Sequence, residues 1–327
     1  MNQTVFSILR LLSDGNFHSG VSIAEQLQCS RATISNTLRY IDTFGIDIAK
    51  LRGRGYQWCN PILWLNPDSI LGYTSINPNY FDLKVFDSVD STNNCLLSNF
   101  ENRQINNDCI FVVAAELQTN GRGRLGRTWH TGLGDSLTFS LRWSFEQGVS
   151  ALSGLSLVIG IAIVRVLKSF SIDNVNLKWP NDILFDHRKL AGVLIELRGE
   201  ILGPSHAVIG IGINFNLSEI VKSSIEQKIT DLSLVTGKCL NRNLVLGALL
   251  SELRNILIDF GKYGFAYFKN EWAGYHAYEG EAILLTLPDG SVIEGVVDGV
   301  NDDGSICLIT ASGENSYNVG DISIRLK

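Results

Sequence analysis

Cysteine is sparse and scattered in this chain of 327 residues, and several common functional patterns are missing. The six cysteines form no C-x-x-C pair and no cluster with histidine at metal-ligand spacing. The N-terminal residues lack the basic segment, apolar run and cleavage site of a secretion signal. Apolar runs such as Val245–Leu250 and Leu155–Ile163 are too short or too interrupted to span a bilayer. We therefore expect a cytoplasmic protein that does not enter a membrane.

Two common nucleotide-binding motifs are also absent, namely the Walker A sequence and the G-x-G-x-x-G dinucleotide fingerprint. The segment Gly121–Trp129 carries a different pattern, G-R-G-R-L-G-R-T-W. Glycine lets the backbone approach a ligand closely, and arginine supplies a planar, permanently charged fork for phosphate or carboxylate. This pattern predicts a mobile loop that grips an anion. A solvated basic turn or a nucleic-acid contact would satisfy the composition equally well.

The net charge of −6 is unevenly distributed. Residues 1–60 carry six basic and four acidic side chains, so their net charge is +2 and that of the remainder is −8. A basic head on an acidic body indicates that only the head meets a polyanion.

The first sixty residues have the pattern of a helix-turn-helix. Apolar residues recur at helical spacing from Val5 to Leu12, Ser22 can cap a second helix, and Ser30 can cap a third that begins S-R-A-T-I-S. Helical hairpins of this length are often purely structural. The strand-like residues 46–48 and 56–58 flank the basic, glycine-hinged turn 51–55, which is suited to phosphate contacts and favours a DNA-binding winged domain.

The remaining chain divides into three parts. Asn60-Pro61 and Asn66-Pro67-Asp68 indicate a linker over 61–79. Residues 80–271 mix strand-like and helix-like runs, and residues 272–327 contain short strands separated by turns, which predicts a small β-barrel. We thus expect domains at 1–60, 80–271 and 272–327.

Four further segments combine polar chemistry with strand ends or helix starts. They are Asp90–Asn93, Lys178–Asp182 (K-W-P-N-D), Lys189–Gly192 (K-L-A-G) and Gly210–Asn214 (G-I-G-I-N). Each has a plain structural interpretation: Ser91 can cap a helix, and Lys189 can be a solvated turn lysine. The alternating glycines at 210 and 212 suggest that something flat lies against that strand.

Taken together, these blocks and their order resemble the biotin–protein ligase family, and the head and C-terminal strands resemble its bifunctional branch, the biotin operon repressors. The resemblance covers essentially the whole chain. It implies an α+β multidomain fold: a winged helix-turn-helix, a central mixed α/β ligase domain of the class II synthetase-like type, and an SH3-like C-terminal β-barrel.

The resemblance also implies an activity. Members of this family use ATP and Mg²⁺ to convert biotin to biotinyl-5′-adenylate, and they transfer biotin to a lysine of the biotin carboxyl carrier protein of acetyl-CoA carboxylase. In the bifunctional branch the adenylate is a corepressor, and a homodimer of the adenylate-bound protein binds operator DNA.

Roles for individual residues follow from the same resemblance. Biotin would be held by Ser91, Thr92, Asn93, Gln118, Arg122, Gly123, Arg124, Lys189 and Gly192, with Trp129 and Val193 as an apolar wall. Catalysis would depend on Lys189, Arg124 and Arg127. The nucleotide would contact Arg127, Asn181, Asp182 and Asn214, with Asp182 also holding Mg²⁺. DNA bases would be read by Arg31, Thr33, Ser35 and Asn36, and phosphates by Arg52 and Arg54.

Two departures from the family pattern bear on these expectations. Leu125 stands where well-known bifunctional members have a further arginine, linked to the dimer surface, so a weaker dimer is expected. The segment Lys228–Ser233 lacks the tryptophan that covers adenine in some repressors, which leaves the adenine cover open. The rival functions are a non-catalytic ligand-sensing repressor, which would lack Lys189 or the phosphate arginines, and a lipoate ligase, which would lack this head and loop sequence.

Overall fold

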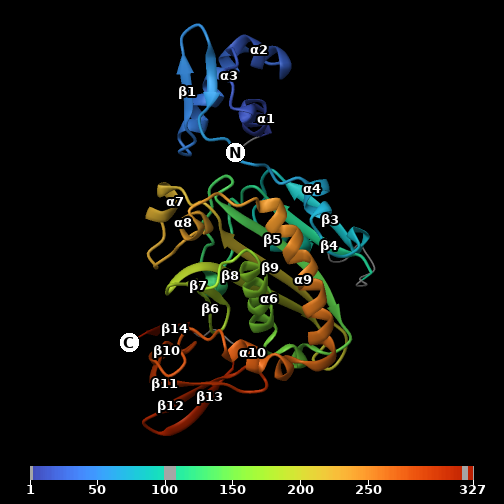
Figure 1. Ribbon diagram of the computed structural model, residues 1–327, viewed down its shortest axis with the longest axis vertical. Coiled ribbons are helices and arrows are strands. Elements are labelled where there is room, and N and C mark those ends of the chain that lie inside the picture. The colour runs from blue at the N-terminus through green and yellow to red at the C-terminus, as the bar shows by residue number, and fades with distance from the viewer. Residues whose placement is uncertain (1–2, 99–107, 319–322, 327) are drawn as a thin grey trace. The chain divides into compact units, whose positions relative to one another are not determined.

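The structure, a computed structural model, describes residues 3–98, 108–318 and 323–326 (Figure 1). The chain forms two compact units. One contains the residues up to Trp64 together with Ser218–Ser224, and the other contains Leu65–Leu217 and the residues from Ile225 onward.

The first unit is a three-helix bundle followed by a two-stranded hairpin: α1 (Gln3–Leu11), α2 (Gly20–Gln26), α3 (Arg31–Asp42), β1 (Ile48–Leu51) and β2 (Gly55–Trp58). Apolar residues at helical spacing fill its core, as expected. Ser30 caps α3, as predicted. The prediction that Ser22 caps α2 is wrong, because Ser19 Oγ accepts the Ser22 N–H at 3.0 Å. The segment Ser218–Ser224, which includes α7 (Glu219–Ser223), clusters with this unit.

The expected linker ends at residue 64. Asn66 caps helix α4 (Pro67–Gly72), which has proline at its first position, so the same letters that suggest a linker start a helix here. The backbone N–H of Asn66 donates to Asn243 Oδ1 at 2.8 Å, and the N–H of Ser75 donates to Ser251 Oγ at 2.9 Å. Residues from Leu65 onward therefore belong to the second unit.

A seven-stranded mixed sheet organises the second unit. Its order is β3-β4-β5-β9-β8-β7-β6; β3 and β4 are parallel, and all other neighbours are antiparallel. The strands are β3 (Phe81–Phe86), β4 (Ile110–Ala115), β5 (Ser136–Phe145), β6 (Val175–Lys178), β7 (Asp182–Phe185), β8 (Arg188–Gly199) and β9 (Ser205–Asn214). The strand β7 was not expected from the sequence.

Helices cover both faces of this sheet. The helices α6 (Leu155–Ser169) and α9 (Arg242–Tyr263) pack together on one face (Figure 1). The short α5 (Thr92–Ser98) packs on the other face, against β4, β5 and β9. By length and composition the stretch Val149–Ser169 could cross a membrane, contrary to expectation, but 67% of its most apolar window is buried within the fold. That burial is the environment of a core helix.

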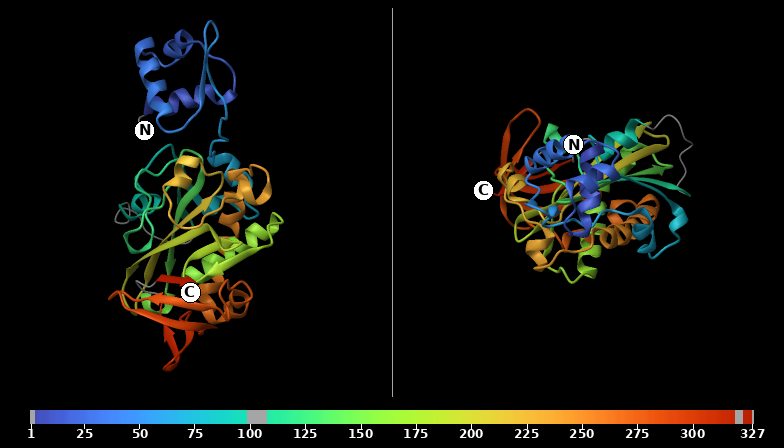
Figure 2. Two further views of the ribbon diagram at one scale, coloured as in Figure 1. Left: turned by 90° about the vertical axis from the view of Figure 1, so that its left-hand side faces the viewer. Right: turned by 90° about the horizontal axis from the view of Figure 1, so that it is seen from above.

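The C-terminal strands form a five-stranded antiparallel sheet of order β13-β12-β11-β10-β14, beside helix α10 (Lys269–Ala273) (Figure 2). They are β10 (Ala282–Thr286), β11 (Val292–Val300), β12 (Ile306–Thr310), β13 (Gly313–Tyr317) and β14 (Ser323–Leu326). The indole N–H of Trp179, after β6, donates to the Gly304 carbonyl of this sheet at 3.0 Å. The fold confirms the expected α+β class with a helix-turn-helix, a central mixed sheet and a small antiparallel β domain.

Candidate functional site

The two faces of the central sheet differ in chemistry. On β5 and β9 the large apolar residues alternate with small or polar ones, and cross-strand partners point to the same side. The apolar set packs under α6 and α9. The other set faces the α5 side and is small or polar except for Val208. It consists of Ser136, Thr138, Ser140, Arg142, Ser144, His206, Val208, Gly210, Gly212 and Asn214. The small residues on the α5 side therefore leave room for side chains from neighbouring loops to lie against this face, which we call the site face.

Asn93, at the start of α5, lies across one row of this face, in which Gly210 is paired with Ser140 and with Leu194. Its Oδ1 accepts the Ser140 hydroxyl at 2.6 Å, and its Nδ2 donates to the Leu194 carbonyl at 3.4 Å. A Cβ at position 210 would overlap the Asn93 amide, so glycine is required there by close approach.

The neighbouring residues of α5 are joined to Gln118. The Thr92 N–H and hydroxyl donate to Gln118 Oε1 at 2.8 and 3.1 Å, and Ser140 Oγ lies 2.7 Å from the Thr92 hydroxyl. Ser91, Thr92 and Asn93 are all at least 96% buried. The structure thus joins Thr92, Asn93 and Gln118, three of the predicted biotin residues, in one polar cluster, and a fourth, Ser91, is buried next to Thr92.

The Arg/Gly segment Gly121–Trp129 is folded into a small hairpin. The Gly123 N–H donates to the Arg127 carbonyl at 2.7 Å, and the Trp129 N–H donates to the Gly121 carbonyl at 2.9 Å. At its tip Leu125 has φ of +57°, an uncommon value for a residue with a branched side chain. The segment was expected to be mobile, and here its backbone is paired.

Trp129 lies on the second row of the site face, where Gly212 is paired with Gly192. A Cβ at Gly212 would overlap the indole ring, so the flat object expected against this strand is Trp129 itself. Val193 does not contribute to an apolar wall here. Its side chain is 98% buried in the core on the opposite face, because it is one residue out of phase with Gly192.

Lys189 is held over this row by both its backbone and its ammonium group. Its N–H donates to the Lys228 carbonyl, and its carbonyl accepts the Thr230 N–H, both at 2.9 Å. Its Nζ lies 2.6 Å from Asp182 Oδ1 and 5.7 Å from the centre of the Trp129 ring. The Lys189 side chain is 18% exposed and that of Asp182 16%, so this is a largely buried ion pair rather than a solvated turn.

The other predicted nucleotide residues surround this pair. Arg124 donates to Asn181 Oδ1 at 3.2 Å, and Asn181 Nδ2 donates to the Val193 carbonyl at 2.8 Å. Asn214 Nδ2 donates to the Thr230 carbonyl at 3.0 Å. Within the described ranges the hydroxyls of Ser136 and Thr230 are buried without a hydrogen-bond partner, and both are close to Asn214 through strand pairing and the bond to Thr230.

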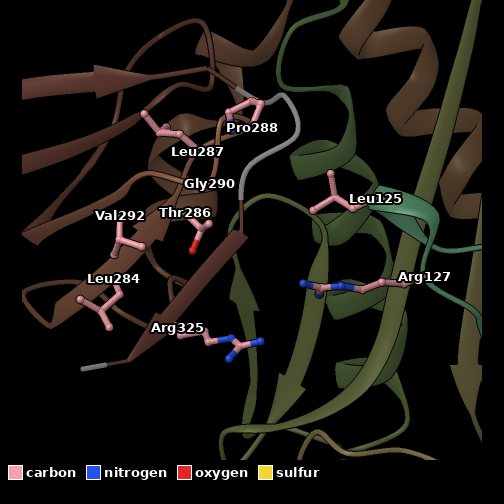
Figure 3. A pocket seen from close by; sticks show the side chains of 9 residues that line it. All are labelled: Leu125, Arg127, Leu284, Thr286, Leu287, Pro288, Gly290, Val292 and Arg325. Atoms are coloured by element: carbon pink, nitrogen blue, oxygen red, sulfur yellow. The ribbon is translucent and has the colours of Figure 1, made fainter.

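Lys178 and Arg325 were not predicted for the site. Burial lowers the pKa of Lys178, and the nearby charges of Lys189, Arg127 and Arg325 lower it further, while Asp182 opposes the shift. Arg127 and Arg325 face a common opening of about 740 Å³, which Leu125 and the β10–β11 turn also line (Figure 3). No local pattern indicated Arg325, because it joins the site through the packing of β14 on β10.

The donor set near Asp182 fits Mg²⁺ that arrives with a phosphate ligand. In the part of the chain that the structure describes, no three His, Cys, Asp or Glu side chains gather as a metal site. Mg²⁺ is commonly held by one or two carboxylates together with substrate phosphates, so Asp182 beside a triphosphate suffices.

The DNA-contact residues predicted on α3 are largely accessible. Arg31, Thr33 and Asn36 are exposed, and Ser35 is half-buried. The Thr33 and Ser30 hydroxyl groups are hydrogen-bonded to each other at 2.9 Å. Asn36 accepts a hydrogen bond from Arg39, an exposed basic residue that was not among the predicted DNA contacts.

The wing residues Arg52 and Arg54 are both exposed. The guanidinium of Arg54 lies 4.6 Å from the centre of the Phe17 ring, which holds it against the bundle, whereas Arg52 occupies the turn between β1 and β2.

Comparison with known proteins gives matches to three family models: an HTH domain over residues 4–57, the biotin/lipoate A/B protein ligase family over 85–214, and the biotin protein ligase C-terminal domain over 280–325.

Individual relatives extend these matches. The bifunctional ligase/repressor BirA of Escherichia coli (strain K12) is 34% identical, covering 99% of this chain and 98% of its own length. The BirA protein of Bacillus subtilis (strain 168) is 26% identical over 94% of both chains. The solved biotin protein ligase from Aquifex aeolicus, in complex with biotin and ATP, matches 75% of this chain and 99% of its own with a TM-score of 0.64 and 31% identity. With all three family models matched in order and a relative aligned along its full length, the chain belongs to the BirA family of bifunctional biotin ligase/repressors.

Proposed function

We propose that this chain activates biotin with ATP and transfers it to one lysine of biotin carboxyl carrier protein. The observation that carries the proposal is the convergence of the α5 cluster, Gln118, the Arg/Gly hairpin and Lys189 on one face of the sheet. The Aquifex relative, solved with biotin and ATP, supports this choice of substrates.

Two bond changes make up the reaction. A biotin carboxylate oxygen attacks the α-phosphorus of ATP and pyrophosphate leaves; the carrier lysine nitrogen then attacks the acyl carbon, AMP leaves and the amine loses a proton. The first step brings negative groups together, so positive groups must offset their repulsion as the transition state forms. Lys189, Arg124 and Arg127 are the groups that we assign to this role.

We assign the remaining residues by their place around Lys189. Biotin is held by Ser91, Thr92, Asn93 and Gln118, by backbone groups of Arg122–Arg124, and by the surface of Gly192 and Trp129. The nucleotide lies toward Asn181, Asp182 and Asn214, where the unpaired hydroxyls of Ser136 and Thr230 offer further polar contacts. Mg²⁺, held by Asp182 and phosphate, neutralises charge on the triphosphate when bound.

The direct test is mass spectrometry of an apo carrier domain incubated with ATP and this chain. Addition of one biotinyl group with biotin, and none with lipoate, is expected. Modification by lipoate alone would identify the chain as a lipoate ligase, and no modification by either acid would favour a ligand-sensing repressor.

Loss of the Arg124 side chain is expected to release the adenylate. Arg124→Gly removes the contact with Asn181 and adds chain freedom to the hairpin that shields the mixed anhydride from water and stray amines. Biotinylation of serum albumin lysines, measured by streptavidin blotting, should rise severalfold. Arg124→Lys keeps a charge without added backbone freedom and should leak less, and modification confined to the carrier lysine in both variants would contradict this role.

We further propose that the chain is a cytoplasmic repressor whose residues 1–60 bind operator DNA, whereas residues 80–271 catalyse ligation and residues 272–327 complete the site. One head with a net charge of +2 binds DNA weakly at physiological salt, with a Kd of about 10⁻⁴–10⁻⁶ M. Two heads on a two-fold dimer grip two half-sites and raise the overall affinity by about 10²–10⁴.

The dimer proposal has a direct test in sedimentation velocity. If the adenylate binds the dimer better than the monomer, its formation must shift the population toward the dimer. Biotin with ATP is therefore expected to shift the chain toward a dimer. An unchanged monomer at tens of micromolar would rule out the corepressor model and leave the ligase proposal standing.

Arg31→Ala is expected to abolish operator binding without slowing ligation. The residue starts the exposed face of α3, and one bidentate base contact contributes about 1–3 kcal/mol per head. Fluorescence anisotropy with DNA from upstream of the biotin genes measures binding, and Lys262→Ala removes an exposed charge from the other unit as a control. Equal DNA binding by the two variants would refute base reading by Arg31.

A further inference from the structure

Glu196 lies on the site face of β8, next to the predicted biotin residues but not among them. Its carboxylate forms a two-point ion pair with Arg122: Oε1 lies 2.8 Å from one terminal guanidinium nitrogen, and Oε2 accepts from the other at 3.1 Å. The same Oε2 accepts the Asn93 amide N–H at 2.8 Å. One carboxylate on the sheet therefore joins the first arginine of the Arg/Gly hairpin to the first turn of α5.

The Arg122 guanidinium also contacts α5 directly. It donates to Asn94 Oδ1 at 2.8 Å, and Asn94 Nδ2 in turn donates to Asp90 Oδ2 at 2.6 Å. The hydrogen bonds from Asn94 and the Ser91 N–H, together with the charge of Arg122, lower the pKa of Asp90. Arg122 thus sits between the carboxylate on β8 and the polar start of α5.

Glu196 also fixes which way the Asn93 amide faces. An asparagine amide can turn by 180° and exchange its oxygen and nitrogen unless its partners distinguish them. A carboxylate accepts only, so the nitrogen of Asn93 must face Glu196, and the oxygen then meets the Ser140 hydroxyl. A neutral glutamine at position 196 could accept or donate, which would leave only the longer bond from Asn93 Nδ2 to the Leu194 carbonyl, at 3.4 Å, to keep the amide in this orientation.

We propose that Glu196 is a positioning residue for biotin, because it orients the Asn93 amide and holds Arg122, and with it the start of the hairpin, against β8 and α5. The inference rests on the proposed function, in which Asn93 and the backbone at Arg122 contact biotin. Glu196 does not itself touch the reacting atoms. Its loss should act on biotin retention and leave ATP use nearly unchanged.

The first measurement compares Glu196→Gln with the parent for biotin dissociation and for the KM of each substrate. We expect biotin to dissociate about tenfold faster, the scale of one charge-assisted contact at a partly exposed site, with a KM for ATP within about twofold of the parent. Glu200→Gln is the matched control, since Glu200 is exposed at the end of the same β8–β9 hairpin and should behave as the parent. Raising the salt concentration should speed biotin release from the parent and have little effect in Glu196→Gln.

A double-mutant cycle with Arg122→Gln then tests whether the two side chains act as a unit. The double variant should release biotin no faster than the faster single variant. The proposal would be overturned if Glu196→Gln lost biotin and ATP affinity equally. It would also be overturned if the thermal unfolding midpoint of this variant fell enough to account for the faster biotin release, since either result would show a merely structural role. If the parent chain ligates biotin and Glu196→Gln retains biotin as well as Glu200→Gln, the inference fails alone; if the parent does not ligate biotin, the proposed function fails.

Discussion

Replacing Lys189 with alanine is expected to slow adenylate formation by about two to three orders of magnitude, the scale of one lost charge contact in a desolvated site. The ammonium group is largely buried, pairs with Asp182 at 2.6 Å and lies beside Trp129. Its position is set by backbone bonds to the 228–230 segment, which do not need the side chain. The nearby charge of Lys178 still faces Asp182 in this variant, so the chain should fold, and the pyrophosphate release rate measures the effect.

Lys228→Ala is the control for this variant. Lys228 is exposed and offers only its backbone carbonyl to Lys189, so its side chain can be removed without disturbing the site. Pyrophosphate release at the parental rate from Lys189→Ala would show that the residue has been wrongly assigned. Equal slowing by both variants would indicate an effect of net charge rather than of position.

The largest expected loss of stability comes from Glu116→Ala. Its carboxylate is fully buried, accepts the Leu65 N–H and pairs with Arg242 at 2.7 Å, and the Arg242 side chain is only 6% exposed. Removing one partner leaves a buried charge uncompensated, which should lower the free energy of unfolding by about 3–5 kcal/mol.

Urea unfolding measures this loss against Asp302→Ala, which breaks the exposed pair with Lys269. The surface pair should contribute no more than about 1 kcal/mol. Similar midpoints for the two variants would contradict a buried pair at Glu116. Because Glu116 precedes Leu117-Gln118, we also expect the destabilised variant to bind biotin less well.

The sequence predicted the central elements well where local patterns are strong. Long apolar periodicity located α6 and α9, and the alternation of glycine with large residues located β9. Local patterns failed where the same short sequence is compatible with two structures. Both Ser19 and Ser22 precede helix-forming residues, and in the structure the backbone is extended at Ser19, which is the cap, while Ser22 already lies within the helix. The strand β13 is mostly polar and lies at a sheet edge, so no alternation indicated it.

The predicted site residues that came together are those in the family blocks, because their spacing places them at strand ends and on one helix start. Lys178 lies in one of these blocks, although no role was predicted for it. Glu196 and Arg325 could not be found from the blocks, because each acquires its part in the site from side chains distant in sequence: Glu196 from Arg122 and Asn93, and Arg325 from the packing of β14 on β10. Val193 is the opposite case: it was predicted for the site but lies in the core, because one step along a strand moves a side chain to the opposite face.

The bond from the Trp179 indole to the Gly304 carbonyl bears on how this chain could be shortened. Trp179 is 99% buried and immediately precedes Pro180, Asn181 and Asp182. A chain trimmed at residue 271 would expose that ring and leave its N–H without an acceptor, directly beside the turn on which the nucleotide side chains stand. A minimal ligase made from this sequence therefore has to keep residues 272–327, because they support the turn that carries the nucleotide side chains and cannot be removed as a separate module.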